Sequence, residues 1–341
     1  MKRILVVDDN LTTLKQISAQ ISEHYDVIVS NHGKHVLRIC MVERPDLILL
    51  DVEMPEMSGF EVISQLKYIP CLRDIPVIFL TAHHDVDVEV EALQSGAVDF
   101  ITKPFEKRIL LHRIDLHIRM DEYQTHLQNS VMELSDNLAF LFAGLIECRD
   151  ENTGYHVLRT SKYVDLIGRE LINRNVFPEL TEDALKMMVR AAPLHDIGKI
   201  AVSDRILLKP DRLTYEEFND MKRHATVGGE ILNNMHRRTP SQSYLHYAKN
   251  IAGFHHERFD GKGYPHGVGQ ENIPLCARIM AVADVYDALI ENRVYRKAMS
   301  HKEAYDIIIE GRGSQFDPRV VDVFSLCEKE IVELAVLLPA S

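Results

Sequence analysis

The stretch DLILLD, residues 46–51, is a short apolar run that ends on a carboxylate. Four similar runs occur in the first third of the chain: ILVV (4–7), DVIVS (26–30), PVIFLTA (76–82) and DFITKP (99–104). Continuous apolar runs of this length, separated by helical patterns, are typical of parallel strands that are buried on both faces and joined by helical crossovers. The first third of the sequence therefore predicts an α/β fold with a doubly wound parallel sheet.

Polar side chains follow these strands at their carboxyl ends, where open α/β sheets collect their ligands. They are Asp8, Asp9, Asp51, Thr81 and Lys103. Three carboxylates that meet at one point repel one another unless a hard divalent cation, most simply Mg²⁺, neutralises them. With that ion in place, Asp51 could accept a phosphoryl group whose oxygens meet Lys103 and Thr81. A lone acidic pair would be interpreted as a helix cap, but capping does not explain five polar residues at strand ends.

These residues, together with MPEMSGFE (54–61) and DFITKPF (99–105), resemble a response-regulator receiver domain over its whole length. The resemblance implies a flavodoxin-like domain over residues 1–120, with Asp51 as phosphoacceptor and a sensor histidine kinase as partner. It implies that Mg²⁺ is held by Asp8, Asp9, Asp51 and the backbone carbonyl of Glu53. It also implies that Thr81 and Lys103 report phosphorylation, with Phe100 as the aromatic switch.

Residues 121–147 carry a heptad pattern of apolar side chains at intervals of four and three. The pattern consists of Leu127, Val131, Leu134, Leu138, Leu141 and Leu145. A seam of this kind is narrower than the apolar stripe of an ordinary surface helix. Two interpretations remain open: one helix that packs on its own domain, or a parallel coiled coil that makes a homodimer and connects the two domains.

The remainder, residues 148–341, has helical spacings throughout and predicts an all-α domain. The clearest helical patterns cover residues 181–202, 213–232, 273–290 and 301–317, and Thr181 is a probable N-cap of the first. Seven residues of this half are candidate metal ligands: His156, His195, Asp196, His224, His255, His256 and Asp284. Several lie in apolar stretches, and buried ionisable groups must be paired or must coordinate a cation. One shared metal centre is the simplest explanation.

The adjacent residues His195 and Asp196 indicate two ions. Neighbours on a helix diverge by about 100°, so the aspartate could bridge two metals while histidines bind each one. Nitrogen and oxygen ligands without cysteine favour Fe or Mn, and zinc, cobalt and nickel remain compatible. Such a pair would activate water and clamp a phosphoryl oxygen. Lys199, four residues after His195, is predicted to share its helix face and to neutralise a substrate phosphate.

HDIGK (195–199) followed by HHERFDGKGYP (255–265) resembles the HD-GYP phosphodiesterases, a branch of the HD superfamily. The resemblance covers about residues 140–325 and implies hydrolysis of cyclic di-GMP to pGpG, and in some members on to GMP. It implies that the seven residues above are the metal ligands, with His195, Asp196 and Lys199 catalytic. It implies substrate contacts from Lys199, Arg293 and Arg296. The loop of Asp260, Gly261, Gly263, Tyr264 and Pro265 would form a cleft wall and a docking element for partner proteins.

Two positions refine this expectation. Some members of the family place a glutamate four residues before the first ligand histidine, where it helps to hold a third metal; here that position is Asn152. The sequence therefore predicts a dinuclear centre. Glu257 is predicted to orient a ligand histidine through its free ring nitrogen.

Composition limits the remaining choices. The 341 residues suggest about two domains, and the formal net charge of −12 argues against a DNA-binding output. Five scattered cysteines indicate a reducing compartment, and without an apolar run of about 20 residues the sequence predicts a cytoplasmic protein that does not enter the membrane. Alternative functions are hydrolysis of cyclic GMP-AMP or pGpG, or a weakly active module that binds cyclic dinucleotides or docks proteins. Whether phosphorylation activates or inhibits is left open.

Overall fold

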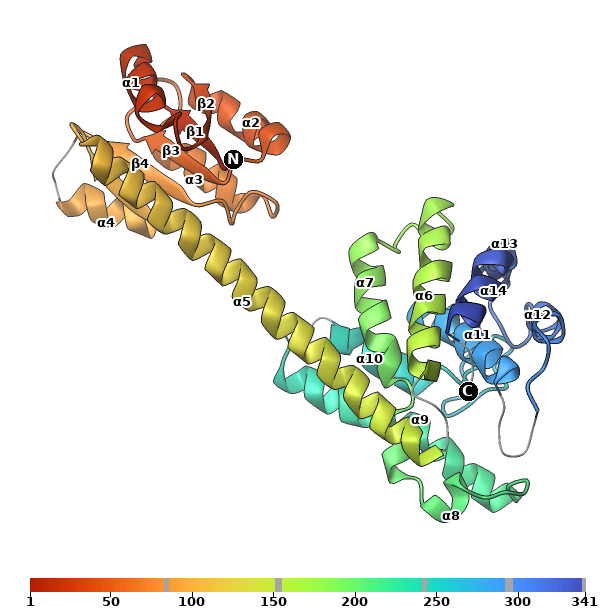
Figure 1. Cartoon of the computed structure of the whole chain (residues 1–341). Helices are drawn as coiled ribbons and strands as arrows, with labels where there is room; N and C mark the ends of the chain where they lie inside the picture. The colour runs from red at the N-terminus through yellow and green to blue at the C-terminus, as the bar shows by residue number, and fades with distance from the viewer. Residues whose placement is uncertain (83–85, 151–154, 241–243, 292–296, 339–341) are drawn as a thin grey trace. The chain divides into compact units, whose positions relative to one another are not determined.

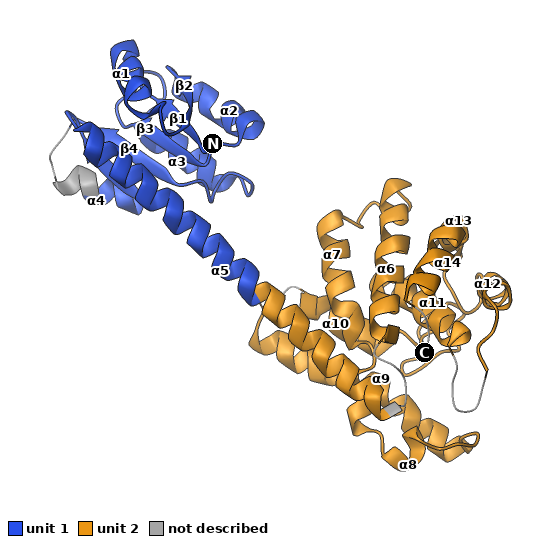
Figure 2. Ribbon diagram, viewed as in Figure 1, with its two compact units in different colours: residues 1–131 blue, residues 132–341 orange. Residues whose placement is uncertain are grey.

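The computed structural model describes residues 1–82, 86–150, 155–240, 244–291 and 297–338 (Figure 1). They form two compact units, Met1–Val131 and Met132–Ser341, which are described separately (Figure 2). Within the described residues, no helix is both long and apolar enough to cross a lipid bilayer.

The first unit contains the predicted parallel sheet, so the doubly wound fold is confirmed. Its five strands lie in the order β2-β1-β3-β4-β5, and every neighbouring pair is parallel. The strands are β1 (Arg3–Val7), β2 (Asp26–Ser30), β3 (Leu47–Asp51), β4 (Val77–Thr81) and β5 (Asp99–Thr102). The register pairs Asp51 with Leu80 and Thr81 with Thr102, which brings the carboxyl ends of β3, β4 and β5 to one edge.

Helices cover both faces of this sheet because alternate strand residues point to opposite sides. One face, with Leu5, Ile48 and Phe79, packs on α2 (Val36–Glu43), α3 (Gly59–Tyr68) and α4 (Val86–Gln94). The other face, with Ile4, Leu49 and Leu80, packs on α1 (Leu11–Ile21) and the first turns of α5. A short 3₁₀ turn, η1 (Gly33–His35), precedes α2.

Helix α5 is continuous over 41 residues, Lys107–Glu147, so it begins in the first unit and ends in the second. In the first unit it is held by Asp99 of β5, which accepts hydrogen bonds from Arg113 and His117. In the second unit it buries Ala139, Ala143 and Ile146. The six residues of the predicted heptad seam remain between 43% and 59% exposed. The helix thus packs on its own unit through a different face and leaves the seam uncovered.

The second unit is helical, and its described residues form no strand, so the all-α prediction is confirmed. Its α-helices are α6 (Tyr155–Asn173), α7 (Glu182–Ala191), α8 (Asp204–Leu207), α9 (Tyr215–Arg238), α10 (Tyr244–Phe254), α11 (Leu275–Ile290), α12 (His301–Glu310), α13 (Pro318–Leu326) and α14 (Glu328–Leu337). Short 3₁₀ helices are η2 (Cys148–Asp150), η3 (Ala192–Leu194), η4 (Ile197–Ala201) and η5 (Gln270–Asn272). The core lies between α6, α7, α10 and α11.

The single helix predicted for residues 181–202 is wrong. Thr181 caps α7 as expected, but α7 ends at Ala191 and the chain continues through η3 and η4. Pro193 lacks the amide that a continuing α-helix needs. Gly198 lies so close to α9 that an added Cβ would stand 1.9 Å from the carbonyl oxygen of His224. The consecutive ligand candidates His195 and Asp196 therefore project from a turn between two 3₁₀ segments, and helical geometry does not relate them to Lys199.

Candidate metal centre

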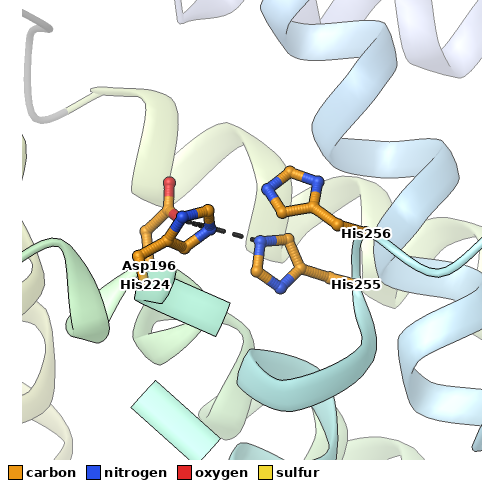
Figure 3. Close-up of side chains that lie close together, drawn as sticks. All are labelled: Asp196, His224, His255 and His256. Carbon is orange, nitrogen blue, oxygen red and sulfur yellow. Dashed lines mark ion pairs between the residues drawn. The ribbon is translucent and has the colours of Figure 1, made fainter. Parts of the chain in front are cut away.

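The seven predicted ligands come together from separate elements of the second unit. Four of them, Asp196, His224, His255 and His256, form one group, and His156, His195 and Asp284 form a second; within each group the ligand atoms lie within 4.8 Å of one another. Figure 3 shows the first group, with the two histidines at the end of α10 facing His224 of α9 and Asp196.

Asp196 lies between the two groups. Its Oδ1 is 3.3 Å from Nε2 of His224 and 3.6 Å from Nε2 of His255. Its Oδ2 is 3.3 Å from Nε2 of His195. Within the second group, Oδ1 of Asp284 is 3.5 Å from Nε2 of His156 and 3.8 Å from Nε2 of His195. One carboxylate thus presents one oxygen to each group, which is the arrangement that a bridging ligand of two cations requires.

Three of the histidines are fixed by a backbone carbonyl at their other ring nitrogen. Nδ1 of His195 donates to the carbonyl of Ala192 (3.0 Å), and Nδ1 of His224 donates to that of Met221 (2.7 Å). Nδ1 of His255 lies 3.0 Å from the carbonyl of Ile251. A carbonyl oxygen can only accept, so Nδ1 carries the proton and the Nε2 lone pair is left for a cation.

The donor set fits divalent metal ions. Among the described residues, Oδ1 of Asp196, Nε2 of His224 and Nε2 of His255 are buried without a hydrogen-bond partner. Three buried acceptors that face one another are costly unless a cation lies between them. The other ligand candidates supply imidazole nitrogen or carboxylate oxygen, and Fe, Mn and zinc bind both kinds of ligand.

The first unit holds the second predicted cluster. Oxygens of Asp8, Asp9 and Asp51 lie within 4.8 Å of one another at the carboxyl edge of the sheet. Lys103 Nζ lies 2.7 Å from Asp8 Oδ2 and 2.9 Å from Asp51 Oδ1. Thr81 is buried at the end of β4. This all-oxygen cluster has the chemistry of a Mg²⁺ site.

Each cluster lies in a part of the chain that matches the model of a known domain family. The response regulator receiver domain matches residues 4–115, and the HD domain matches residues 148–320. The chain belongs to the response regulators with an HD domain.

Two similar proteins match nearly the whole chain, and a third matches part of it. A "Probable cyclic di-GMP phosphodiesterase" of Vibrio cholerae is 40% identical, and the match covers 97% of this chain and 79% of that protein. The "Cyclic di-GMP phosphodiesterase response regulator RpfG" of Xanthomonas campestris is 36% identical over 94% of this chain and 86% of that protein. A "3'3'-cGAMP-specific phosphodiesterase 2" of Vibrio cholerae is 34% identical over 63% of this chain and 39% of that protein.

Burial and charge set the protonation of the HD-domain cluster. Burial raises the pKa of Asp196, but nearby positive charge, Lys199 above all, outweighs burial and holds that pKa well below the usual value. Burial and the neighbouring imidazoles lower the pKa of His256 far below the usual value. Burial likewise lowers the pKa of His224. Within the first group these shifts favour the carboxylate form of Asp196 and neutral imidazoles at His224 and His256, the forms that bind metal.

The HD domain also contains a buried network that the sequence analysis missed. Nδ1 of His156 lies 2.7 Å from Oδ2 of Asp287, whose two oxygens also accept from Nε (2.6 Å) and Nη2 (2.8 Å) of Arg159. Nη2 of Arg159 donates in addition to Glu291 (3.0 Å). Burial alone would lower the pKa of His156, but the bond to Asp287 and nearby carboxylates raise it to about 9. The available signal was spacing, because Asp287 follows Asp284 by three residues on the same helix.

The role predicted for Glu257 is wrong. Its Oε1 accepts from the backbone amides of His266 (2.6 Å) and Gly267 (3.1 Å). It therefore holds the loop after Pro265, whereas the fixed histidines use backbone carbonyls or Asp287.

The loop of residues 260–265, here called the GYP loop, needs its two glycines for different reasons. Gly261 has φ +75°, but Gly263 is required by close approach, since a Cβ there would lie 2.3 Å from the amide nitrogen of Arg258. The ring of Tyr264 lies against His256, with centroids 4.7 Å apart. The loop thus borders the metal cluster directly.

The structure describes some of the remaining predicted site residues and not others. Lys199 Nζ lies 2.9 Å from Oδ2 of Asp196 at the cluster. Arg293, Arg296 and Asn152 lie outside the described residues. In the receiver domain, burial, partly offset by Lys103, raises the pKa of Asp51 to about 6. Phe100 is half-buried against the sheet core, and Glu53 is exposed.

Proposed function

We propose that this response regulator hydrolyses cyclic di-GMP to pGpG at a dinuclear metal centre under control of phosphorylation at Asp51. The observation that carries the proposal is the position of Asp196, which faces one ligand group with each of its two oxygens. The cyclic di-GMP phosphodiesterases that are similar over most of the chain support the choice of substrate.

The protein's part in the reaction is positioning and charge. The seven ligands would hold two divalent ions, with Fe or Mn favoured by the nitrogen and oxygen donors. When bound, such ions activate water and neutralise charge on the phosphoryl group. Lys199 brings a positive charge to the same cluster for a phosphate oxygen of the substrate. The Tyr264 ring walls the cluster on the side of His256.

Control would begin at the receiver. A phosphoryl group on Asp51 would attract Lys103, which now contacts both Asp8 and Asp51, while Mg²⁺ held by the three carboxylates offsets the negative charge. The donor would be a sensor histidine kinase. The exposed seam of α5 would pair with a second copy of the chain as a coiled coil, and the GYP loop would be available to docking proteins.

Anaerobic loading with Fe or Mn, followed by chromatography of products from cyclic di-GMP, cyclic GMP-AMP and pGpG, tests the reaction. We expect pGpG from cyclic di-GMP, and the incubation with pGpG shows whether hydrolysis continues to GMP. A preference for cyclic GMP-AMP would favour the second candidate, which the similarity to a 3'3'-cGAMP-specific phosphodiesterase supports. Elemental analysis should give two ions in the HD domain, and three would contradict the dinuclear centre.

The matched control for regulation is Asp51→Asn. It removes the phosphoacceptor and leaves the HD-domain ligands intact, so a phosphodonor should change the hydrolysis rate of the wild type but not that of the variant. Equal responses of the two proteins would refute control through Asp51.

A further inference from the structure

The end of helix α5 contacts Lys199. Glu147, the last residue of α5, is buried, and its Oε1 lies 3.6 Å from Lys199 Nζ. Lys199 Nζ also lies 2.9 Å from Oδ2 of Asp196. The buried carboxylate of Glu147 and the largely buried carboxylate of Asp196 therefore flank one ammonium, and Glu147 terminates the helix that begins in the receiver domain.

A second contact fastens the same helix end to the backbone around Lys199. Arg149, two residues beyond α5, donates to the carbonyls of Lys199 (3.4 Å), Ile200 (3.5 Å) and Val202 (3.1 Å). It also donates to Oδ1 of Asp204 (2.6 Å). The Lys199 carbonyl also accepts from the backbone amide of Val202 (3.0 Å), so the guanidinium of Arg149 adds a side-chain donor to a turn that already has this main-chain bond. The segment that carries Lys199 is thus held through its main chain as well as through its side chain.

The two carboxylates beside Lys199 differ in what else they can do. Asp196 has both oxygens directed at histidines of the ligand groups, so a cation there would compete with Lys199 for it. Glu147 belongs to neither ligand group. With Asp196 engaged, Glu147 is the carboxylate that keeps the Lys199 ammonium in place beside the cluster.

We propose that Glu147 and Arg149 are positioning residues that connect α5 to Lys199. A displacement or rotation of the last turn of α5 would move the Lys199 ammonium relative to the substrate phosphate, and α5 starts four residues after Lys103, the lysine at Asp51. Errors of about 1 Å in the position of such a group can cost on the order of a hundredfold in rate. The inference deepens the proposed function and rests on it for the role of Lys199 in phosphate binding.

The first test does not need catalysis. Full-length wild type, Glu147→Gln and the matched variant Glu133→Gln, at an exposed position of the same helix, are treated with limiting acetic anhydride. Acylation of Lys199 is measured by peptide mass spectrometry relative to the exposed Lys302. We expect acylation of Lys199 to be several-fold faster in Glu147→Gln, because the flanking carboxylate is lost, and unchanged in Glu133→Gln. An unchanged rate in Glu147→Gln would overturn the proposal.

The second test uses the loaded enzyme with cyclic di-GMP. Glu147→Gln should lower kcat/KM by about tenfold or more with the metal content unchanged. The ratio of rates with and without acetyl phosphate should fall toward one, and Glu147→Asp should recover part of it. A merely structural role would lower activity without changing that ratio, and an unchanged ratio would overturn the proposal.

Failure of the proposed function can be distinguished from failure of this inference. If the wild type releases no pGpG, the proposed function fails, whereas the acylation rates still decide whether Glu147 holds Lys199. If Glu147→Gln does not fold, Arg149→Lys carries the same two tests, because it keeps the charge and loses the forked contacts to the carbonyls. Wild-type acylation and response ratios in Arg149→Lys would then overturn the proposal.

Discussion

Replacing Asp287 by asparagine should destabilise the HD domain more than its conservative shape suggests. Arg159 and Asp287 are both completely buried, and the carboxylate accepts two hydrogen bonds from the guanidinium at 2.6 and 2.8 Å. An amide keeps one acceptor and turns two N–H donors toward groups that themselves donate. Removing one partner of a buried ion pair costs roughly 3–5 kcal/mol. We expect about 3 kcal/mol, the low end of that range, because Glu291 still accepts from Arg159.

The same substitution should weaken metal binding. His156 Nδ1 now lies 2.7 Å from Asp287 Oδ2, so the neutral ring that binds a cation keeps its proton on Nδ1 and offers the lone pair of Nε2. An asparagine amide facing Nδ1 favours the opposite tautomer, with a proton on the nitrogen that faces Asp284. Loss of such an orienting partner typically costs about 10–100-fold in metal affinity.

The measurements are urea unfolding of the metal-free protein, followed by circular dichroism, and calorimetric titration with Mn²⁺. The control is Asp306→Asn, which breaks a half-exposed pair with Lys302 on α12 and should cost at most about 1 kcal/mol. If Asp287→Asn matches Asp306→Asn in both unfolding midpoint and Mn²⁺ affinity, the buried network does not have the role derived from its geometry.

Three further predictions have definite expected outcomes. Gly198→Ala should destabilise the HD domain by about 3 kcal/mol, the upper end for overpacking, because the new Cβ would meet the His224 carbonyl. The control Gly144→Ala has open space around its position on α5 and should stabilise the protein by about 0.5–1 kcal/mol. Thermal unfolding of the two variants measures both effects. Burial raises the pKa of Asp99, but hydrogen bonds from α5 and its own strand outweigh it and hold the pKa below the usual value. The stability that Asp99 contributes is therefore complete above about pH 4 and lost as the pH falls further, and Asp99→Asn should remove this acid-sensitive part of the receiver's unfolding free energy. Glu257→Ala should speed hydrogen exchange at the amides of His266 and Gly267, which now donate hydrogen bonds to the Glu257 carboxylate. Unchanged exchange at these amides would contradict the anchoring role of Glu257.

The fold of the receiver domain could be predicted from the sequence because its central strands are buried and end on functional residues. A run such as DLILLD needs no partner to be recognised, and parallel topology then places Asp51 beside Lys103 without further information. The break at residues 192–201 was harder. Pro193 could have been recognised in the sequence as a helix breaker. Glycine is needed at position 198 because the backbone there approaches α9 closely, and no local sequence pattern indicates that contact.

The metal cluster shows the same division between local and distant causes. His195, His224 and His255 are oriented by carbonyls three or four residues earlier, so the helical chain that carries each ring also fixes its tautomer. His156 depends on Asp287, 131 residues away. Sequence reasoning therefore picked out ligand candidates that the fold brings together, because their residue types are distinctive. It looked for an orienting carboxylate in the adjacent Glu257. A carboxylate can orient a ring only if the fold brings it to Nδ1, and here α11 packing on α6 does so, while Glu257 is left to hold a loop.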